Sequence, residues 1–392
     1  MSRLRVALMG DICMEGIQER MNPAYAKQLL APMQKLLQSC DLRVANLENA
    51  ICSPDTPIRK CGPNLWQTPE NLCFLREAGI DCTVLANNHV GDFGPEPVMA
   101  TIDELHRAGF PTVGAGANLD DAYIPWITEK NGIRLAVVAV CENEFGGATL
   151  TEAGTAAYDL HRVAKTLKAA HTQADFVVLV MHGGNEYNPL PSPRVRARYR
   201  TFVDLGADAV IGMHPHCIQG YEIYEGSPIV YSTGNFLFPG FPSSQPSWFR
   251  GYVPELTLEK GKPIEITVHP YSFDKGPDAI TPDEGETKAT MLAYIDKLSA
   301  YIADEAEIRR LFDGWTMITG PDHAALAGRF EPEYEALTDV PKGHPMYAVR
   351  NIRTCEAHNE LVTNYCRMIV EGRIAAGKIA AGEVRALQKM PV

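Results

Sequence analysis

The sequence predicts an α/β protein in which helices cover a sheet of mainly parallel strands, followed by a mainly helical C-terminal extension. Short apolar runs alternate with amphipathic stretches through most of the 392-residue chain. Most of these runs stop at a polar side chain. Beyond residue 285, apolar residues recur at helical spacing. Alternating βα units of this length favour a parallel sheet with helices on both faces.

The strands and helices follow each other in a regular order. We expect strands at 4–9, 42–46, 82–86, 134–141, 176–181, 208–212 and 229–232. We expect helices at 24–38, 69–78, 95–108, 159–171 and 193–205. Pro69, Pro95 and Pro193 each fall in the first turn of a predicted helix, where proline needs no backbone N–H partner.

The chain then divides into two parts. Residues 252–259 and 264–268 alternate in polarity and are predicted to be edge strands that close the sheet. The segment 274–285 is rich in turn residues and acids, so it marks a boundary between a domain over 1–275 and a helical extension over 286–392. The extension shows no cluster of metal-binding residues, which leaves packing, oligomerisation or covering the site as its role.

Composition limits the possible functions. The formal net charge of −12 disfavours binding to duplex nucleic acid. No apolar segment approaches the roughly 18 residues of a membrane span, and the N-terminal apolar run stops too early for a signal peptide, so we expect a cytoplasmic protein. The ten cysteines include no C-x-x-C pair, which favours reduced core thiols over disulfides.

One basic segment stands out in this acidic chain. Four arginines alternate along the predicted helix 193–205: Arg194, Arg196, Arg198 and Arg200. They could form a solvated helix surface, or they could line the approach of an anionic substrate.

Polar groups that can bind metal follow five of the predicted strands. They are Asp11, Asn46 with Glu48, Asn87 with Asn88 and His89, His182, and His214 with His216. Ligand sites in α/β folds form outside the carboxyl ends of the strands, so we expect these groups to converge in one cleft. Each has an ordinary alternative role as a helix cap, a turn residue or a core histidine, but none of these explains why all five strands end alike.

The same residues resemble a known family. The motifs are Gly10-Asp11, Asn46-Leu47-Glu48, Ala86-Asn87-Asn88-His89 with Asp92, His182-Gly183-Gly184, His214-Pro215-His216 and Gly234-Asn235-Phe236. In this order, over about residues 4–238, they resemble the CapA family. That family is named for poly-γ-glutamate capsule synthesis, and its fold is related to the calcineurin-like metallophosphatases. The chain after about residue 275 is not covered by the resemblance.

The resemblance implies a role for each site residue. Glu48 would bridge two divalent metal ions, which oxygen and nitrogen donors suit if they are Mn, Zn or Fe. Asp11 and His216 would hold one ion, and Asn88, His182 and His214 the other. The two ions would activate a water molecule. His89 would donate a proton to the leaving group, and Asp92 would orient His89.

The chain departs from the metallophosphatase pattern at two points. Metallophosphatases commonly carry Asp-x-His after the first strand, where this chain has Asp11-Ile12-Cys13. Cys13 could supply a thiolate or could point into the core, which would leave one metal short of a ligand. Glu48 also replaces the usual bridging aspartate, and its side chain is longer by one methylene.

Two functions from different classes follow. The first is a metal-dependent phosphoesterase-like hydrolase acting on an anionic small-molecule or polymeric substrate. The second is a non-catalytic capsule-assembly factor that binds poly-γ-glutamate or a synthetase partner and uses its metal for binding alone. A metal-free α/β binding module is a third possibility, which requires that all five strand endings coincide by chance.

Overall fold

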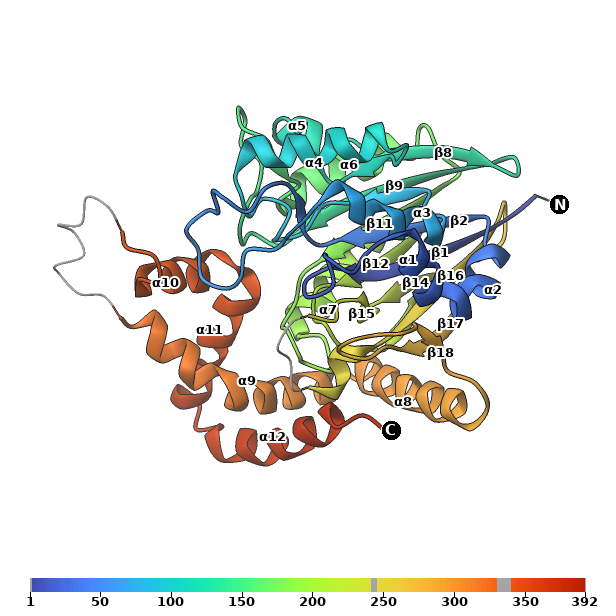
Figure 1. Cartoon of the computed structure of the whole chain (residues 1–392). Coiled ribbons are helices and arrows are strands. Elements are labelled where there is room, and N and C mark those ends of the chain that lie inside the picture. The colour runs from blue at the N-terminus through green and yellow to red at the C-terminus, as the bar shows by residue number, and fades with distance from the viewer. Residues whose placement is uncertain (1, 241–244, 330–339, 392) are drawn as a thin grey trace.

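Two β-sheets pack face to face in the computed structural model, which describes residues 2–240, 245–329 and 340–391 (Figure 1). The first sheet has the order β18 (Thr281–Pro282), β17 (Glu265–Ser272), β16 (Arg250–Glu259), β1 (Arg3–Ile12), β2 (Leu42–Leu47), β5 (Cys82–Val84) and β6 (Thr112–Val113), with β15 (Asn235–Leu237) also paired to β1. The second has the order β13 (Tyr221–Tyr224), β14 (Ser227–Val230), β12 (Ala209–Met213), β11 (Phe176–His182), β9 (Ile133–Cys141) and β8 (Trp126–Lys130).

The inner strands of both sheets are parallel. In the first sheet β15, β1, β2, β5 and β6 run in one direction, and in the second β9, β11, β12 and β14 do. The antiparallel strands β16, β17 and β18 extend the first sheet, while β8 and β13 form the edges of the second. Two short sheets, β3 (Ala50–Ile51) with β4 (Trp66–Gln67) and β7 (Ala115–Gly116) with β10 (Gly154–Thr155), lie in the loops.

Strand β1 shows why these strands are apolar throughout. Its side chains alternate between faces: Leu4, Val6 and Leu8 enter the core between the sheets, whereas Ala7 and Met9 pack in a second core beneath helices. A strand covered on both faces has no solvated side, so an uninterrupted apolar run is expected.

Helices cover the outer faces. The first sheet is covered by α1 (Pro23–Leu30), α2 (Gln34–Ser39), α3 (Cys73–Ala78) and α4 (Pro95–Arg107), with the 3-10 turns η1 (Ala31–Met33) and η2 (Pro69–Leu72) between them. The second sheet is covered by α6 (Leu160–Ala170) and α7 (Pro193–Asp204). The remaining short elements are α5 (Leu119–Ala122) and η3 (Pro246–Phe249).

The C-terminal extension is helical, as expected. It consists of α8 (Gly285–Ala303), α9 (Glu305–Ala327), α10 (Pro345–Thr354), α11 (Glu356–Val370) and α12 (Ile374–Gln388). Leu298, Trp315, Leu361 and Val384 from these helices belong to the same buried cluster as the second sheet. The division into domains at 275 and 286 stays a prediction. Among the described residues no helix is long and apolar enough to cross a bilayer.

The predicted elements are present, but their arrangement corrects two expectations. All seven predicted strands appear within a few residues of their expected bounds, as do the predicted helices 95–108, 159–171 and 193–205. The helix expected at 24–38 is divided into α1, η1 and α2, and the one expected at 69–78 consists of η2 and α3. The expectation of a single sheet was wrong, because the strands divide between two sheets. An apolar strand has the same sequence pattern whether a helix or another sheet covers it. Its sequence therefore does not show to which sheet the strand belongs. Strand β16 is also not an edge strand, since it lies between β1 and β17.

A glycine in β12 permits close packing at the end of this strand. A Cβ at Gly212 would lie 2.0 Å from the carbonyl oxygen of Tyr231 and 2.9 Å from the Tyr199 ring. We expect Gly212→Ala to lower the free energy of unfolding by about 1–3 kcal/mol, as overpacking does. Gly382→Ala in α12, where no atom lies within 4 Å, should raise it by about 0.5–1 kcal/mol. Urea denaturation measures both, and equal midpoints for the two variants would contradict the packing argument.

Candidate metal centre

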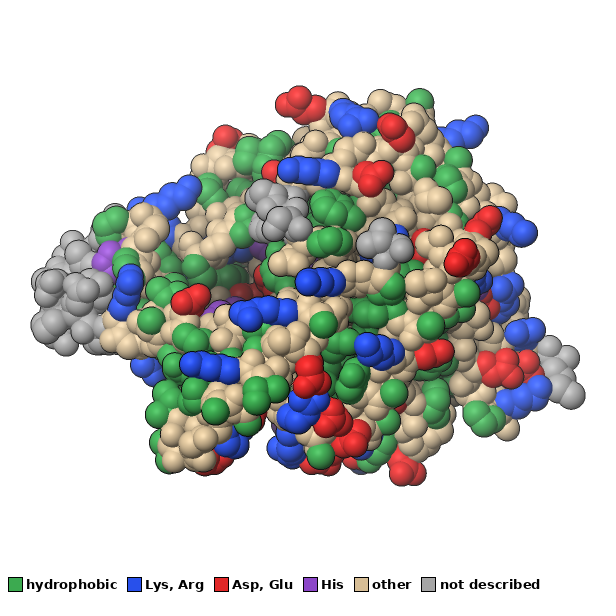
Figure 2. Space-filling model, turned by 90° about the horizontal axis from the view of Figure 1, so that it is seen from below, with side chains coloured by type: hydrophobic (Ala, Val, Ile, Leu, Met, Phe, Trp, Pro, Cys, Tyr) green, Lys and Arg blue, Asp and Glu red, His purple; other side chains and the backbone are tan. Residues whose placement is uncertain are grey.

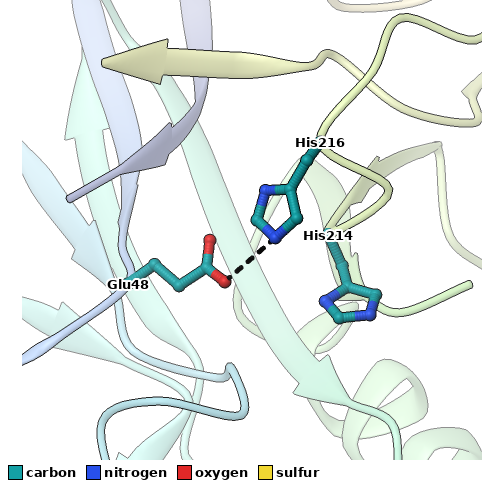
Figure 3. Close-up of side chains that lie close together, drawn as sticks. All are labelled: Glu48, His214 and His216. Atoms are coloured by element: carbon teal, nitrogen blue, oxygen red, sulfur yellow. Dashed lines mark ion pairs between the residues drawn. The ribbon is translucent and has the colours of Figure 1, made fainter. Parts of the chain in front are cut away.

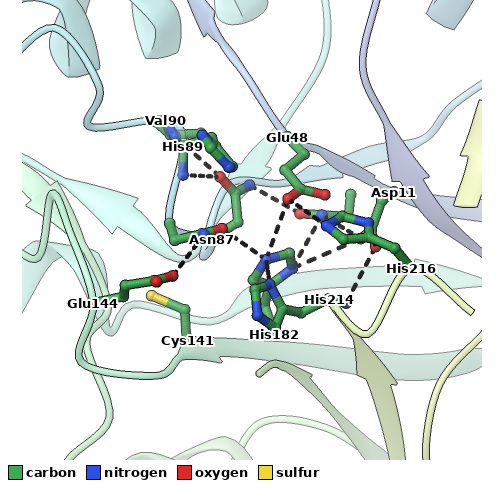
Figure 4. Close-up of polar contacts among 12 residues, drawn as sticks. Asp11, Glu48, Asn87, His89, Val90, Cys141, Glu144, His182, His214 and His216 are labelled. Atoms are coloured by element: carbon green, nitrogen blue, oxygen red, sulfur yellow. Dashed lines mark hydrogen bonds and ion pairs between the residues drawn. The ribbon is translucent and has the colours of Figure 1, made fainter. Parts of the chain in front are cut away.

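The structure places six predicted metal ligands around one point at the carboxyl ends of the strands. Figure 4 shows Asp11, Glu48, His182, His214 and His216 there, and Asn88 Oδ1 lies 3.0 Å from Nε2 of His182. Asp11 lies near the end of β1, Glu48 directly follows β2, and His182 ends β11. The loops after β5 and β12 supply the other three, which are Asn88, His214 and His216. Every one of these side chains is buried. Two neighbouring parallel sheets therefore contribute to one site, since both present their carboxyl ends here.

A chain of amides connects the Asp11 carboxylate to the loop after β5. The Asn46 side chain donates a 2.7 Å hydrogen bond to Asp11, and Asn87 donates one of 3.0 Å to Asn46. The Asn87 oxygen accepts from the backbone N–H groups of His89 and Val90. Asn87 is therefore a turn residue, as its type favours, and it holds the loop that carries Asn88 and His89.

Glu48 is a buried carboxylate at the middle of the site. It is 0% exposed, and neither oxygen accepts a hydrogen bond from the described residues. Nε2 of His182 and Nε2 of His216 each lie 3.6 Å from its Oε1. Figure 3 shows the ring of His216 directed at this carboxylate. Burying such a group is costly unless a counter-charge is present. Burial raises the pKa of Glu48 well above its ordinary value and that of Asp11 to about 6, and a divalent cation would supply the missing charge.

The imidazoles direct ring nitrogens toward this point. His216 donates from Nδ1 to the side-chain oxygen of Asn235 at 2.8 Å, which leaves its Nε2 directed at Glu48. Nε2 of His182 faces Asn88 Oδ1 at 3.0 Å, His214 Nδ1 at 3.1 Å and Glu48 Oε1 at 3.6 Å. One proton cannot satisfy three such neighbours, whereas metal ions shared among them can.

The backbone at the two loop histidines is strained. His214 has φ 97° and His216 has φ 52°, both in the left-handed region that favours glycine. Such conformations persist where the surroundings require them, and they concentrate at functional sites. Here they turn both rings toward Glu48.

Two overlapping donor groups could each hold an ion. Glu48, His214 and His216 form one, and Asp11, Glu48 and His182 form the other. Glu48 belongs to both, which suits a bridging carboxylate. The expected division paired Asp11 with His216 and His182 with His214. The ligands of each ion, and the number of ions, stay predictions.

His89 lies beside a buried acid and a buried lysine. Its Nδ1 donates to Asp92 Oδ2 at 2.7 Å, and Asp92 also accepts from the backbone N–H of Leu65 and pairs with Lys60. Lys60 Nζ is 3.3 Å from the same ring nitrogen. Burial, and then the Lys60 charge, lower the pKa of His89. Asp92 thus holds the ring as expected, whereas Lys60 was missed because nothing in its surrounding loop marks it.

Two acids after β9 also reach the site and were missed. Glu142 pairs with Arg194 at 2.8 Å and with Arg198 at 2.9 Å, while Glu144 accepts from the Asn88 amide at 2.6 Å. A signal for them existed in the sequence. The apolar run 134–141 ends at Glu142, so it obeys the same rule that identified the five other strands.

The arginines of α7 form ion pairs with acidic side chains of the same chain. This arrangement corrects the two expectations for them, a solvated helix surface and a set of free charges along the approach of an anionic substrate. Arg194 and Arg198 bind Glu142, Arg200 binds Glu222, and Arg196 lies 3.8 Å from Glu305. Arg196 and Arg198 are buried rather than solvated. With their charges paired, the four residues are not a free anion clamp. The alternating positions of the arginines in the sequence could not reveal these ion pairs, because the acidic partners lie far away in the chain.

Cys13 lies in the core. Its side chain packs with Leu65, Phe238 and Trp248 and is 0% exposed. Burial raises the pKa of its thiol well above the ordinary value. Of the two expected roles, the structure therefore supports the apolar one, and Cys13 belongs to neither donor group at Glu48.

The C-terminal extension forms part of the wall around the site. A small cavity is lined by Asn88, Glu142, Glu144, His182, His214 and, from the extension, Cys355. Seen from below, the molecule has a hollow in which histidine and acidic side chains are visible (Figure 2). The extension therefore covers the site, which was one of its three expected roles.

The fold and the donor set together define a two-sheet α/β protein with a candidate metal centre. Residues 5–240 match the family model described as bacterial capsule synthesis protein PGA_cap, and the chain belongs to this family. The capsule biosynthesis protein CapA of Bacillus anthracis is 28% identical over 68% of this chain and 70% of its own length. The PGA biosynthesis protein CapA of Bacillus subtilis is 29% identical over 60% of this chain and 63% of its own length. The resemblance stated from the motifs is confirmed.

Among solved structures, a phosphatase from Mycoplasma pneumoniae aligns with 68% of this chain and 94% of its own, with 14% identity and a TM-score of 0.43.

Metal affinity should depend on pH through the buried carboxylates. The pKa of Asp11 is raised to about 6, so a proton competes with metal below this pH. We expect affinity for Mn²⁺ or Zn²⁺ to fall by about tenfold per pH unit as the pH drops below about 6. The stability of the metal-free protein should change in the opposite direction and increase as the pH falls. Its folded state binds this proton more tightly than the unfolded chain, so protonation of Asp11 adds stability that is lost as the pH rises through 6. Chelator competition and urea denaturation test the two trends, and a pH-independent affinity would contradict the assignment.

Proposed function

We propose that this protein is a metal-dependent hydrolase of phosphoesters whose centre is built around Glu48. The observation that carries the proposal is the buried Glu48 carboxylate, to which no N–H or O–H group of the described residues donates, while Asp11 and the imidazoles of His182, His214 and His216 surround it. Asp11, Asn88 and these three histidines would hold the ions with Glu48. Divalent ions bound there supply an activated water and neutralise phosphoryl oxygens.

The chain's own residues supply proton transfer and orientation. The Nδ1–H of His89 is held by Asp92, so its Nε2 is the atom that can carry a proton to the leaving oxygen. The lowered pKa makes protonated His89 a stronger acid but a less populated one at neutral pH. Lys60 fixes the other oxygen of Asp92 and so keeps this carboxylate in place. Burial of the whole group excludes bulk water from the reacting atoms.

The substrate we propose is anionic, either a small phosphoester or a polymer. The names of the Bacillus relatives connect the family with capsule and PGA biosynthesis. Polyglutamate contains no phosphoester, so it is a candidate ligand for the alternative binding role and not a substrate of this hydrolysis. A cytoplasmic location stays a prediction.

The proposal is tested by reconstitution. Protein stripped with a chelator is reloaded separately with Mn²⁺, Zn²⁺ or Fe²⁺ and assayed on a broad set of phosphomonoesters and phosphodiesters. We expect turnover to return with metal in the wild type and in Glu152→Gln, which changes an exposed acid. Glu48→Gln should stay inactive. Wild-type protein that binds metal but hydrolyses none of these esters would contradict the proposal and favour a binding factor, which retention of poly-γ-glutamate by the loaded protein would identify.

A further inference from the structure

A separate group of metal-type donors lies where the extension meets the loop after β9. Glu144, Cys355 and His358 each offer one ligand atom, and these atoms all lie within 4.8 Å of one another. Cys355 caps the start of α11 and His358 is three residues further on, so both side chains lie on one face of the helix. Cys355 is 2% exposed and forms no disulfide.

The hydrogen bonds behind His358 determine which of its nitrogens is free. His323 lies 3.0 Å from the carbonyl oxygen of Thr319, so its Nδ1 must donate and its Nε2 must accept. The donor to that Nε2 is Nδ1 of His358, at 3.1 Å. The remaining Nε2 of His358 faces Glu144 Oε1, 3.5 Å away, and the same oxygen accepts a 3.0 Å hydrogen bond from the Asn351 amide. A proton or a cation must lie between Nε2 and the carboxylate, because both atoms are otherwise acceptors.

We propose that Glu144, Cys355 and His358 bind one transition-metal ion of the zinc class, at a site distinct from the centre around Glu48. Thiolate, imidazole and carboxylate together are a donor set that zinc accepts, with water as the fourth ligand. The two negative charges match a dication. His323 would play the part usual for the partner of a metal-binding histidine, since it accepts the N–H of the nitrogen that does not bind metal. Binding would displace the proton of the Cys355 thiol and any proton held between His358 Nε2 and Glu144, whereas the Nδ1 proton of His358 stays in its hydrogen bond to His323.

The site would connect the extension to the main centre. The second oxygen of Glu144 accepts a 2.6 Å hydrogen bond from the Asn88 amide, whose oxygen faces His182. An ion at Glu144 therefore ties α11 to the loop that carries Asn88. The sequence showed no cluster of metal-type residues within the extension itself, since its Cys355 and His358 form a donor group only together with Glu144, about 200 residues earlier in the chain. The inference does not depend on phosphoesterase activity.

Cobalt substitution tests the proposal without an activity assay. Metal-free protein is titrated with Co²⁺, which shows a sulfur-to-cobalt charge-transfer absorption only when a thiolate binds it. The centre around Glu48 has no thiolate ligand, so this absorption reports the proposed site. We expect it in the wild type, in Cys366→Ser, which changes an exposed cysteine of the same helix, and in Cys13→Ser. It should be absent from Cys355→Ser.

A second variant keeps the test decisive if Cys355→Ser does not fold. His323→Ala removes only the acceptor behind His358, and the affinity of the thiolate-bound cobalt should fall by about 10- to 100-fold. No charge-transfer absorption in the wild type would overturn the proposal. The same holds if the absorption survives in Cys355→Ser, if Cys13→Ser abolishes it, or if His323→Ala leaves the affinity unchanged.

Discussion

His182→Ala is expected to lose bound metal and hydrolytic activity together. The Nε2 atom of His182 lies within 3.0–3.6 Å of Asn88, His214 and Glu48, so its removal opens the middle of the donor set. Metal ions contribute several kcal/mol of transition-state stabilisation, which corresponds to a fall in turnover of at least about 10³-fold. Elemental analysis and phosphoester turnover on the same sample measure the two losses.

His161→Ala is the matched control for this change. His161 is exposed on α6 and takes no part in the metal centre, so the variant should keep both metal and activity. A His182→Ala protein that retains its full metal content would remove this residue from the ligand set. Full activity at reduced metal content would show that hydrolysis does not depend on the metal centre around Glu48.

His89→Ala is expected to keep its metal and to lose rate. Its Nδ1 is held by Asp92 and it belongs to neither donor group at Glu48, so the role left for it is proton transfer. General acid–base groups typically contribute about 10²- to 10⁴-fold. The loss should be smallest for substrates with phenolate-type leaving groups, because these depart without a proton. Steady-state turnover on a series of leaving groups measures this dependence.

Asp92→Asn provides a graded comparison for the same role. It keeps the shape of the side chain but weakens the hold on His89, so it should show the same leaving-group dependence with a smaller loss. A His89→Ala protein that loses its metal, or that slows equally on good and poor leaving groups, would contradict the proton-donor role.

The sequence reveals the strands and most of the candidate centre for a simple physical reason. A strand buried on both faces must be apolar, so a polar side chain at its end is informative. Asp11, Glu48, His182 and His214 all follow such strands, and the parallel direction of the strands brings their ends together. The same rule, that a polar side chain at the end of a buried apolar strand marks the site, also points to Glu142, but it was not applied to the strand 134–141.

What the sequence could not reveal depends on contacts between distant segments. Lys60 comes from a loop without periodicity, and its role follows only from its place beside Asp92. Cys355 and His358 lie in an extension outside the recognised motifs, and Glu144 completes their group. The sequence also could not reveal how the strands divide between two sheets, because the apolar pattern of a strand does not identify the strands with which it pairs.

Anomalous diffraction from crystals loaded with Mn²⁺ tests the central claim most directly. The account predicts two peaks on either side of the Glu48 carboxylate, about 3.5–4 Å apart as in two-metal hydrolytic sites, with Asp11, His182, His214 and His216 as neighbours. A single peak at Glu48 would leave the metal centre but contradict the two-metal reaction. No peak within bonding distance of Glu48 would contradict the account as a whole.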